Sequence, residues 1–458
     1  MNLPNYFLAD LPPEAALNAK MVSEAGQALR RNRERFLAGR RTQSLIGALA
    51  EVSKGWLKPG DPFREMALRL GPGATGFSEQ TLAFGLDTLF GTLTASGMEA
   101  IVLQDLGHLE RLDQVVASDS EEAGQRAAFA RGPELLVHIA AGTLPNPVIV
   151  SMVVGLLARS AQFVKCASGT SLLPRLFAHS IYQSEPKLGA CLEVAEWKGG
   201  TEDLESALFA EAQCVTVTGT DQTLADVRAR IPAHVRTVGY AHRVSLGYVT
   251  RDVLTSFNAH QVAALAARDV AAWDQVGCLS PHAIYVESGG RVSPMEFAEL
   301  LGAEMAALER IRPRGRLHPE QSAAIAARRS FYQVRAAHSP ETRIWCSPDS
   351  TAWTVVYENE PSFVPSCLNR FIYVKSVESL TQALEGAASV SHQVSTVGLA
   401  ASGSKTRSLA LEFARWGASR ICPLGQMQAP PLAWRHDGRP TLGDLIIWSD
   451  LETHFHEA

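Results

Sequence analysis

The fold is decided by a stretch in the middle of the chain that reads LLVHIAAGTLPNPVIVSMVVGLLARSAQFVK, residues 135–165. It starts as a short apolar strand, passes through a turn rich in Gly and Pro, and continues as an apolar helix into a second strand, residues 161–165. This order is the repeating unit of a parallel sheet covered by helices. Further predicted strands at 191–197 and 214–217 continue the rhythm, so the sequence predicts an α/β fold.

A second unit with the same rhythm follows. It contains predicted strands at 244–249 and 283–286, with a helix over 258–267 between them. The chain has 458 residues, which is enough for two or three hydrophobic cores. We therefore predict two domains, residues 1–241 and 242–434, each built on a parallel sheet.

The composition argues against several classes of protein. Hydrophobic residues make up 46% of the chain and charged residues 19%, which is typical of a globular protein. The net charge is −5, so no basic excess indicates binding to nucleic acid or to an anionic membrane. The longest apolar stretch, residues 147–157, is too short to span a bilayer. The first residues show no basic region followed by an apolar run, so we expect a cytoplasmic protein.

The seven cysteines are irregularly spaced, and none belongs to a Cys-x-x-Cys pair or a Cys/His cluster with zinc-ligand spacing. We therefore expect reduced thiols and no metal site. Cys278 lies in a turn that reads WDQVGCLSPH, residues 273–282. Gly277 allows this turn to expose the sulfur, and nearby backbone N–H groups can stabilise a thiolate and an oxyanion. Cys278 is the candidate nucleophile, and the alternative is a small buried apolar residue.

Two strand ends in the first domain are candidate binding sites. One is Thr218-Gly219-Thr220, which precedes a helix whose free N–H groups attract phosphate. The alternative there is an ordinary strand-to-helix turn with a threonine cap. The other is Lys165, at the carboxyl edge of the predicted sheet, where ligands bind in open α/β folds. Lys165 and Ser168 can contact ribose hydroxyls or a 2′-phosphate, and the alternative for Lys165 is a surface lysine.

In this order, these segments resemble the aldehyde dehydrogenase superfamily, in which strands ending in Lys and in Thr-Gly-Ser build the cofactor site and a later turn carries the nucleophilic cysteine. Within it, the chain resembles the acyl-CoA reductase family typified by LuxC, the fatty acid reductase subunit of bacterial luminescence. The resemblance covers roughly residues 130–450 and rests on Asp274-Gln275-x-x-Cys278-x-Ser280-Pro281, Pro145-x-Pro147-x-x-x-Ser151, Ala167-Ser168-Gly169-Thr170, Asn369-Arg370 and His436-Asp437-Gly438.

The resemblance implies an aldehyde dehydrogenase-like α/β fold with two Rossmann-like parallel-sheet domains and a small oligomerisation arm. Residues 1–241 then form a helical N-terminal region and a nicotinamide-cofactor-binding domain, and residues 242–434 form the catalytic domain that carries Cys278. The arm is expected near 110–135, together with the tail at 435–458. It implies a homo-oligomer, a dimer or a tetramer.

The resemblance also implies the chemistry. Cys278 attacks an acyl thioester, and hydride from NADPH or NADH, with NADPH favoured, reduces the acyl-enzyme to an aldehyde. His242 is the candidate general acid/base, and Thr143 and Asn146 are candidates to stabilise the oxyanion. The residues implied to bind the cofactor are Lys165, Ser168, Thr218, Gly219, Thr220 and Glu360. The acyl donor is acyl-CoA or an acyl carrier protein, and an acyl-activating enzyme is a possible partner.

One departure from the superfamily is informative. Hydrolytic aldehyde dehydrogenases carry a Glu that activates water, whereas the corresponding stretch here, residues 239–245, reads GYAHRVS and contains no carboxylate. A reductase must avoid hydrolysing its acyl-enzyme, so this absence favours aldehyde formation. The alternatives are an aldehyde dehydrogenase that forms an acid or acyl-CoA, a reductase of acyl phosphates, and a non-catalytic assembly subunit of the same fold.

Overall fold

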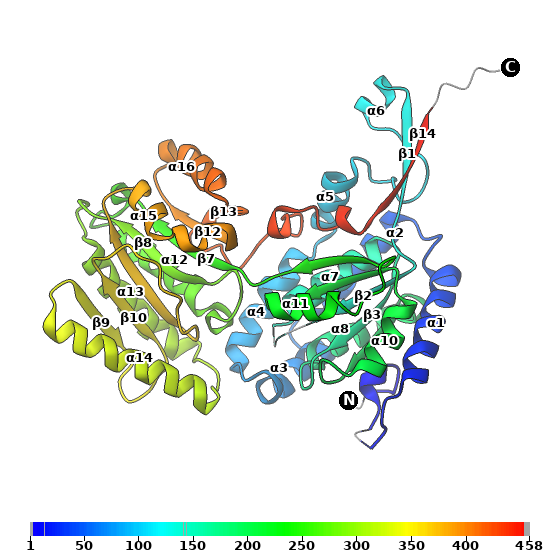
Figure 1. Cartoon of the computed structure of the whole chain (residues 1–458), viewed down its shortest axis with the longest axis horizontal. Helices are drawn as coiled ribbons and strands as arrows, with labels where there is room; N and C mark the ends of the chain where they lie inside the picture. Colours follow the sequence, from blue (N-terminus) through cyan, green and yellow to red (C-terminus); the bar gives the residue numbers. More distant parts are fainter. Residues whose placement is uncertain (1–2, 13, 141, 143, 453–458) are drawn as a thin grey trace. The chain divides into compact units, whose positions relative to one another are not determined.

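The computed structural model describes residues 3–12, 14–140, 142 and 144–452. The chain divides into two compact units (Figure 1). Unit 1 contains residues 1–75, 89–241 and 431–458, and unit 2 contains residues 76–88 and 242–430. The domain boundary predicted from the sequence also lies after residue 241. The prediction differs from the structure in two places: it assigned residues 76–88 to the first domain, and it ended the second domain at residue 434 instead of 430.

The helices of unit 1 are α1 (Ala19–Phe36), α2 (Thr42–Trp56), α3 (Pro62–Thr75), the end of α4 (Glu79–Thr92), α5 (Ala95–Leu106), α6 (Asp119–Ala123), α7 (Asn146–Leu157), α8 (Leu172–Ser184), α9 (Pro186–Gly189), α10 (Glu202–Glu211) and α11 (Asp221–Arg228). Its strands are β1 (Arg126–Arg131), β2 (Leu135–Ile139), β3 (Ala161–Cys166), β4 (Leu192–Glu196), β5 (Cys214–Thr218), β6 (Arg236–Tyr240) and β14 (Ile447–Glu452).

The sheet of unit 1 has five parallel strands in the order β4-β3-β2-β5-β6. Every residue of β2 and β3 is buried, as expected of parallel strands with helices on both faces. Helix α1 packs on α10 and β3, while α7 packs on β3 and is covered by α2. The chain passes from β2 to β3 on one side and returns to β5 on the other. The strand order therefore reverses between β2 and β5, and this reversal opens a crevice at the carboxyl edge of the sheet.

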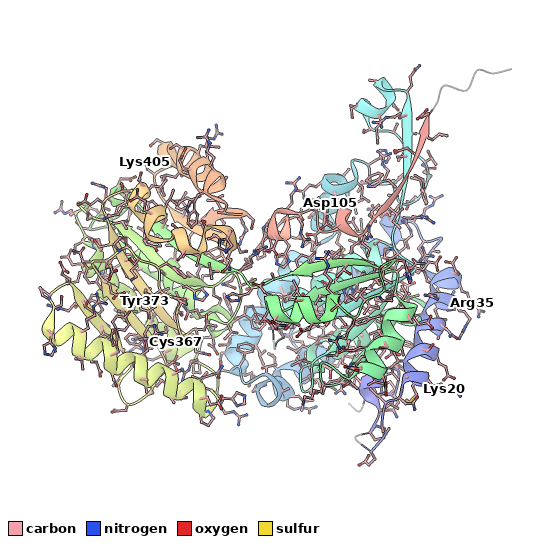
Figure 2. All side chains as sticks on the ribbon, viewed as in Figure 1. Lys20, Arg35, Asp105, Cys367, Tyr373 and Lys405 are labelled. Carbon is pink, nitrogen blue, oxygen red and sulfur yellow. The ribbon has the colours of Figure 1, made fainter. Side chains whose placement is uncertain are left out.

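The two segments that the sequence proposed for an arm pair with each other. Strands β1 and β14 form a separate antiparallel ribbon with Arg126 opposite Glu452 and Arg131 opposite Ile447 (Figure 1). Asp105 of α5, labelled in Figure 2, accepts hydrogen bonds from the N–H groups of Leu442 (2.8 Å) and Gly443 (3.1 Å). This carboxylate ties the tail to unit 1 just before β14 begins.

Unit 2 contains the start of α4 and the helices α12 (Ala259–Ala271), α13 (Pro294–Ile311), α14 (Pro319–His338), α15 (Leu380–Gly386) and α16 (Gly403–Trp416). Its strands are β7 (Val244–Val249), β8 (Pro281–Glu287), β9 (Thr342–Cys346), β10 (Thr354–Glu358), β11 (Phe371–Val377), β12 (Val394–Ala400) and β13 (Arg420–Pro423). Short 3-10 turns in the two units lie at Leu8–Asp10, Arg251–Val253, Ala272–Gln275, Ala388–Gln393, His436–Gly438 and Gly443–Leu445.

The sheet of unit 2 has seven strands in the order β13-β12-β7-β8-β11-β10-β9. All neighbours are parallel except β9, which pairs antiparallel with β10. Apolar side chains fill the space on both faces. For example, Tyr373 of β11, labelled in Figure 2, is fully buried. Its ring packs edge-on against that of Tyr332 of α14, with 5.6 Å between the ring centroids. The predicted α/β fold with two parallel sheets is confirmed. Within the described part of the chain, we find no helix with the length and apolar character needed to cross a bilayer.

Candidate active site

The turn that carries Cys278 is built from an unusual run of backbone. Trp273, Asp274 and Gln275 are consecutive residues with positive φ angles of 49°, 49° and 65°. L-amino acids adopt this left-handed conformation at a cost of about 1–2 kcal/mol per residue. The run ends α12 sharply and directs the chain through Cys278 into the amino end of β8. Such a run persists only where the surrounding structure holds it.

A second left-handed run holds the first. Leu368, Asn369 and Arg370 have φ angles of 58°, 55° and 66° and lie just before β11. The Gln275 amide donates to the carbonyl of Phe371 (2.9 Å) and accepts from its N–H group (2.7 Å). Each run therefore fixes the backbone of the other through buried hydrogen bonds.

A buried ion pair completes this connection. The Arg370 guanidinium, 0% exposed, lies 2.7 Å from the carboxylate of Asp274 and 2.8 Å from that of Glu309. It also donates to the carbonyl of Arg312 at 2.9 Å. Arg370 thus pairs with carboxylates inside unit 2, and the Asp274-Gln275 and Asn369-Arg370 motifs are two halves of one structural element.

Cys278 itself is half-buried, and its backbone is anchored. The Ser245 hydroxyl, on the neighbouring strand β7, donates to the carbonyl of Cys278 at 2.7 Å. Ser280 N–H closes the turn on the carbonyl of Gly277 at 2.9 Å, and the Gln428 amide donates to the Ser280 hydroxyl at 3.0 Å. Sequence reasoning missed Ser245, although a polar residue inside an otherwise apolar, fully buried strand was an available signal.

Two histidines belong to the same edge of the sheet as Cys278. His242 is exposed and precedes β7, while Cys278 precedes β8, and these strands are parallel neighbours. His282 is buried on β8 and its Nδ1 accepts a hydrogen bond from Ser366 N–H at 3.2 Å. Burial, with a smaller effect from His242, lowers the pKa of His282 to about 4, so His282 is neutral at pH 7. Of these two histidines, His242 is therefore the exposed one.

The structure does not bring Glu360 to this edge. Glu360 follows the carboxyl end of β10, which runs parallel to β8 in the same sheet, whereas Cys278 precedes the amino end of β8. Seven residues of strand separate the two edges of β8, or about 23 Å at roughly 3.3 Å per residue. Glu360 instead lies 3.4 Å from Arg335, and its neighbour Glu358 pairs with Lys375 at 2.5 Å.

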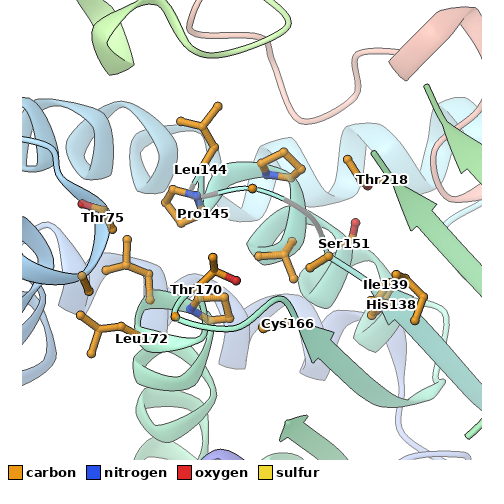
Figure 3. Close-up of a pocket in the computed structure, with 18 of the residues that line it drawn as sticks. Thr75, His138, Ile139, Leu144, Pro145, Ser151, Cys166, Thr170, Leu172 and Thr218 are labelled. Atoms are coloured by element: carbon orange, nitrogen blue, oxygen red, sulfur yellow. The ribbon is translucent and has the colours of Figure 1, made fainter. Parts of the chain in front are cut away.

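The candidate cofactor residues other than Glu360 belong to unit 1, at the carboxyl edge of its sheet. A cavity opens there at the point where the strand order reverses, and Figure 3 shows His138, Ser151, Cys166, Thr170 and Thr218 around it. Of the predicted cofactor residues in unit 1, Thr218 lines this cavity, whereas Lys165, Ser168, Gly219 and Thr220 do not. Ser168 is exposed in the turn that leads to α8.

Lys165 is 3% exposed, so the alternative of a surface lysine is wrong. Its side chain lies on the α10 side of the sheet, with Nζ 5.8 Å from the ring centroid of Trp197, and burial lowers its pKa although Glu205 opposes the shift. Among the described residues, Nζ has no hydrogen bond or ion pair. A buried ammonium whose donors are left without such partners fits a cofactor hydroxyl or phosphate.

The Thr218-Gly219-Thr220 turn has a structural role. The hydroxyl of Thr220 accepts from the N–H of Thr223 at 3.2 Å and so caps α11, which is the alternative that the sequence left open. At Gly219, an added Cβ would lie 2.9 Å from a methyl of Thr223, so glycine allows α11 to pack close to the turn.

Of the two oxyanion candidates, Thr143 lies outside the described residues, and Asn146 begins α7 in unit 1. The Oδ1 atom of Asn146 is buried and finds no hydrogen-bond partner in the described parts of the chain. This buried amide oxygen lacks a hydrogen-bond donor. A ligand at the carboxyl edge can supply one.

A family model described as "Acyl-CoA reductase (LuxC)" matches residues 37–448. The chain belongs to this family. The LuxC family match includes the Cys278 turn, the buried ion pair of Arg370 with Asp274 and the strands of both parallel sheets. No curated protein matches the sequence.

Several solved structures have a fold similar to that of this LuxC family member. The proline utilization A protein, which is bifunctional, aligns over 98% of this chain and 46% of its own, with a TM-score of 0.71 and 14% identity. The chain thus spans about half the length of that protein. An NAD-dependent benzaldehyde dehydrogenase from Corynebacterium glutamicum aligns over 98% of this chain and 92% of its own (TM-score 0.70, 14% identity). A putative aldehyde dehydrogenase from Anabaena variabilis aligns over 97% and 95%, respectively (TM-score 0.68, 14% identity). The fold is therefore that of aldehyde dehydrogenases.

Proposed function

We propose that the chain reduces the acyl group of a thioester, acyl-CoA or acyl carrier protein, to an aldehyde with NADPH or NADH. The observation that carries the proposal is the Cys278 turn, which the Ser245 hydrogen bond and the two left-handed runs hold in one conformation. A nucleophile held in this way needs little reorganisation before attack. The stretch at 239–245 offers no carboxylate to activate water.

In the proposed reaction, the Cys278 thiolate attacks the thioester carbonyl, and the carrier thiol leaves with a proton. Cys278 then holds the acyl group as a new thioester. A bound nicotinamide cofactor supplies the hydride that this acyl group requires. The acyl oxygen takes up a proton as the hydride adds, which gives a thiohemiacetal. The thiohemiacetal loses this proton again as the carbon–sulfur bond breaks, so the aldehyde leaves and Cys278 is restored as a thiolate. We assign the proton transfers to His242, whose exposure allows exchange with solvent. The oxyanion roles of Thr143 and Asn146 stay predictions from the family resemblance.

A reduction assay tests the proposed function directly. Purified protein is incubated with NADPH or NADH and with acyl-CoA thioesters of increasing chain length, and the product is identified as aldehyde or acid. We expect aldehyde, with one cofactor oxidised per thioester consumed. Steady formation of acid without cofactor oxidation would instead indicate hydrolysis.

Thiol labelling is expected to select Cys278 among the seven cysteines. Burial raises the pKa of Cys166 and Cys191 to about 12 and that of Cys422 to about 11, so these thiols remain protonated at pH 7. Brief treatment with iodoacetamide followed by peptide mass spectrometry should therefore modify Cys278 fastest, with protection by acyl-CoA. Faster labelling of any other cysteine would contradict the assignment.

We also propose that Lys165 binds the cofactor. Lys165→Met keeps most of the buried volume but removes the charge, so the Kd and KM for NADPH should rise about tenfold to a hundredfold. The KM for acyl-CoA should change little. Lys198→Met, at an exposed lysine in the turn after β4, is the matched control and should leave both constants unchanged. A larger effect on acyl-CoA than on cofactor would remove Lys165 from the cofactor site.

Finally, we propose that the β1–β14 ribbon mediates a homo-oligomer, a dimer or a tetramer. Ile447, Trp448 and Leu451 of β14 are about 40% exposed on a strand whose one partner among the described residues is β1. Light scattering after chromatography would give the mass. Ile447→Lys with Trp448→Lys should convert the oligomer to a monomer, and an unchanged mass would place the interface elsewhere.

A further inference from the structure

A chain of four buried polar groups crosses the sheet of unit 1 and ends at the cavity on its carboxyl edge. The Gln162 amide nitrogen donates to the carbonyl of Met152 at 2.9 Å, and its Oε1 lies 2.8 Å from Nε2 of His138. Nδ1 of His138 lies 2.6 Å from the hydroxyl of Thr216. The exposed fractions of Gln162, His138 and Thr216 are 0%, 2% and 7%. Gly155 provides the space, since a Cβ there would lie 2.5 Å from the Gln162 amide.

The direction of each hydrogen bond in this chain is determined by its buried end. A carbonyl only accepts, so the Gln162 amide must present its NH₂ to Met152 and its oxygen to His138. Nε2 of His138 therefore carries the hydrogen. Burial lowers the pKa of His138 to about 4, so the ring is neutral at pH 7 and Nδ1 can only accept. The hydroxyl of Thr216 must then donate its single hydrogen to Nδ1.

This direction leaves Thr216 with one function toward the cavity. Thr216 and His138 both belong to the cavity lining (Figure 3 labels His138). Because the hydroxyl hydrogen is already used, Oγ1 has only lone pairs to offer. A ligand atom that meets Oγ1 must therefore be a hydrogen-bond donor, and an acceptor there would face repulsion and an unsatisfied buried group.

The same cavity is not built for an anion. None of its described lining residues is Lys, Arg, Asp or Glu. The N–H groups of Gly169 and Ser171, near the start of α8, already donate to the carboxylate of Glu196 at 2.6 and 3.1 Å. Pro147 and Pro174, in the first turns of α7 and α8, have no N–H group to offer. A phosphate group would therefore meet no cationic side chain among the described lining residues, and two N–H groups near the start of α8 are already used.

We propose that this cavity binds an uncharged group that donates a hydrogen bond to Thr216 Oγ1. The inference rests on the proposed function, which supplies its two candidate ligands. Each of these ligands carries such a donor. One is the carboxamide of the nicotinamide cofactor, and the other is an amide or hydroxyl of the coenzyme A arm. Lys165 lies on the other side of the sheet, since strand residues 162 and 165 point to opposite faces and Gln162 faces α7.

Direct binding measurements with two substitutions test the proposal. Thr216→Val keeps the shape and removes the hydroxyl, while Thr216→Ser keeps the hydroxyl. Calorimetry on the full chain gives the Kd of four ligands: NADPH, NADH, the 3-acetylpyridine analogue of NADH, and coenzyme A. In the analogue, a methyl group replaces the carboxamide NH₂. Thr216→Val should weaken binding of either the cofactors or coenzyme A about tenfold and leave the other unchanged, and Thr216→Ser should bind like the parent.

The ligand analogue identifies the donor without relying on the substitution alone. If the carboxamide is the donor, the parent protein should bind NADH about tenfold more tightly than the acetylpyridine analogue, and Thr216→Val should abolish this preference. A loss confined to coenzyme A assigns the site to the acyl carrier arm. Unchanged binding of both ligand classes, an equal loss of both, or a Thr216→Ser variant as weak as Thr216→Val would overturn the proposal. Binding is measured without turnover, so failure of the reductase assay is a separate result.

Discussion

Replacing Cys278 by alanine is expected to abolish acyl transfer and leave cofactor binding intact. The substitution removes the sulfur that forms the acyl-enzyme, so kcat/KM should fall by at least about 10³-fold. The fold should persist because Cys278 is half-buried and its anchoring contact from Ser245 reaches the backbone carbonyl, which alanine retains. Incubation with radiolabelled acyl-CoA should yield no labelled protein, while NADPH binds with the parent Kd, since the predicted cofactor residues of unit 1 are untouched.

Cys346→Ala is the matched control for this experiment. Cys346 is also half-buried and also in unit 2, but it lies on β9, the antiparallel edge strand of the sheet. The control should retain both acyl labelling and turnover. Turnover within a factor of two of the parent in Cys278→Ala would end the proposed mechanism.

Replacing Arg370 by methionine is expected to cause the largest loss of stability. The guanidinium is fully buried and bridges the carboxylates of Asp274 and Glu309, so its removal leaves Asp274 buried without its cation. Breaking a buried pair from one side typically costs about 3–5 kcal/mol of unfolding free energy. The loss should be visible as a lower urea midpoint. The two left-handed runs would also lose their main ionic contact, so labelling of Cys278 should slow in the fraction that remains folded.

Arg415→Met provides the comparison at the surface. Arg415 pairs with Glu412 on α16 with both side chains at least half exposed, and such pairs contribute less than about 1 kcal/mol. If Arg370→Met lowers the urea midpoint no more than Arg415→Met does, the ion pair of Arg370 with Asp274 does not stabilise the Cys278 turn. The double variant Asp274→Asn with Arg370→Met should be less destabilised than Arg370→Met, because no unpaired carboxylate remains.

The local character of the Cys278 turn could be predicted from sequence, whereas its conformation could not. Gly277, Ser280 and Pro281 indicate a turn wherever they occur together. Left-handed backbone at Trp273, Asp274 and Gln275 has no comparable signal, because this conformation is usually assigned to glycine. It exists here because Gln275 bonds to the backbone of Phe371, a residue 96 positions away in the chain.

The orientation of the candidate ligand-binding residues was likewise hidden. Parallel strands with helices on both faces are apolar throughout, so their sequence carries no alternation that tells which side chain faces which helix layer. Lys165 could be placed at the end of β3, but its contact with Trp197 on the α10 side required the sheet to be assembled. The hydrogen bonds of His138 could not be predicted from the sequence either. Its roles as donor to Gln162 and acceptor from Thr216 depend on residues from three different strands.

The sequence by itself determined the α/β class, the two parallel sheets, the turn that presents Cys278 and the absence of a carboxylate at 239–245. These properties follow from residues close together in the chain, whose spacing and turn chemistry set the local backbone. Only the tertiary structure decided that Arg370 pairs with Asp274, that Glu360 lies at the edge of the sheet opposite to Cys278, and that Thr216 can only accept a hydrogen bond from a ligand. Each of these depends on strand order and on contacts between distant segments, and no local pattern encodes which distant segments become neighbours.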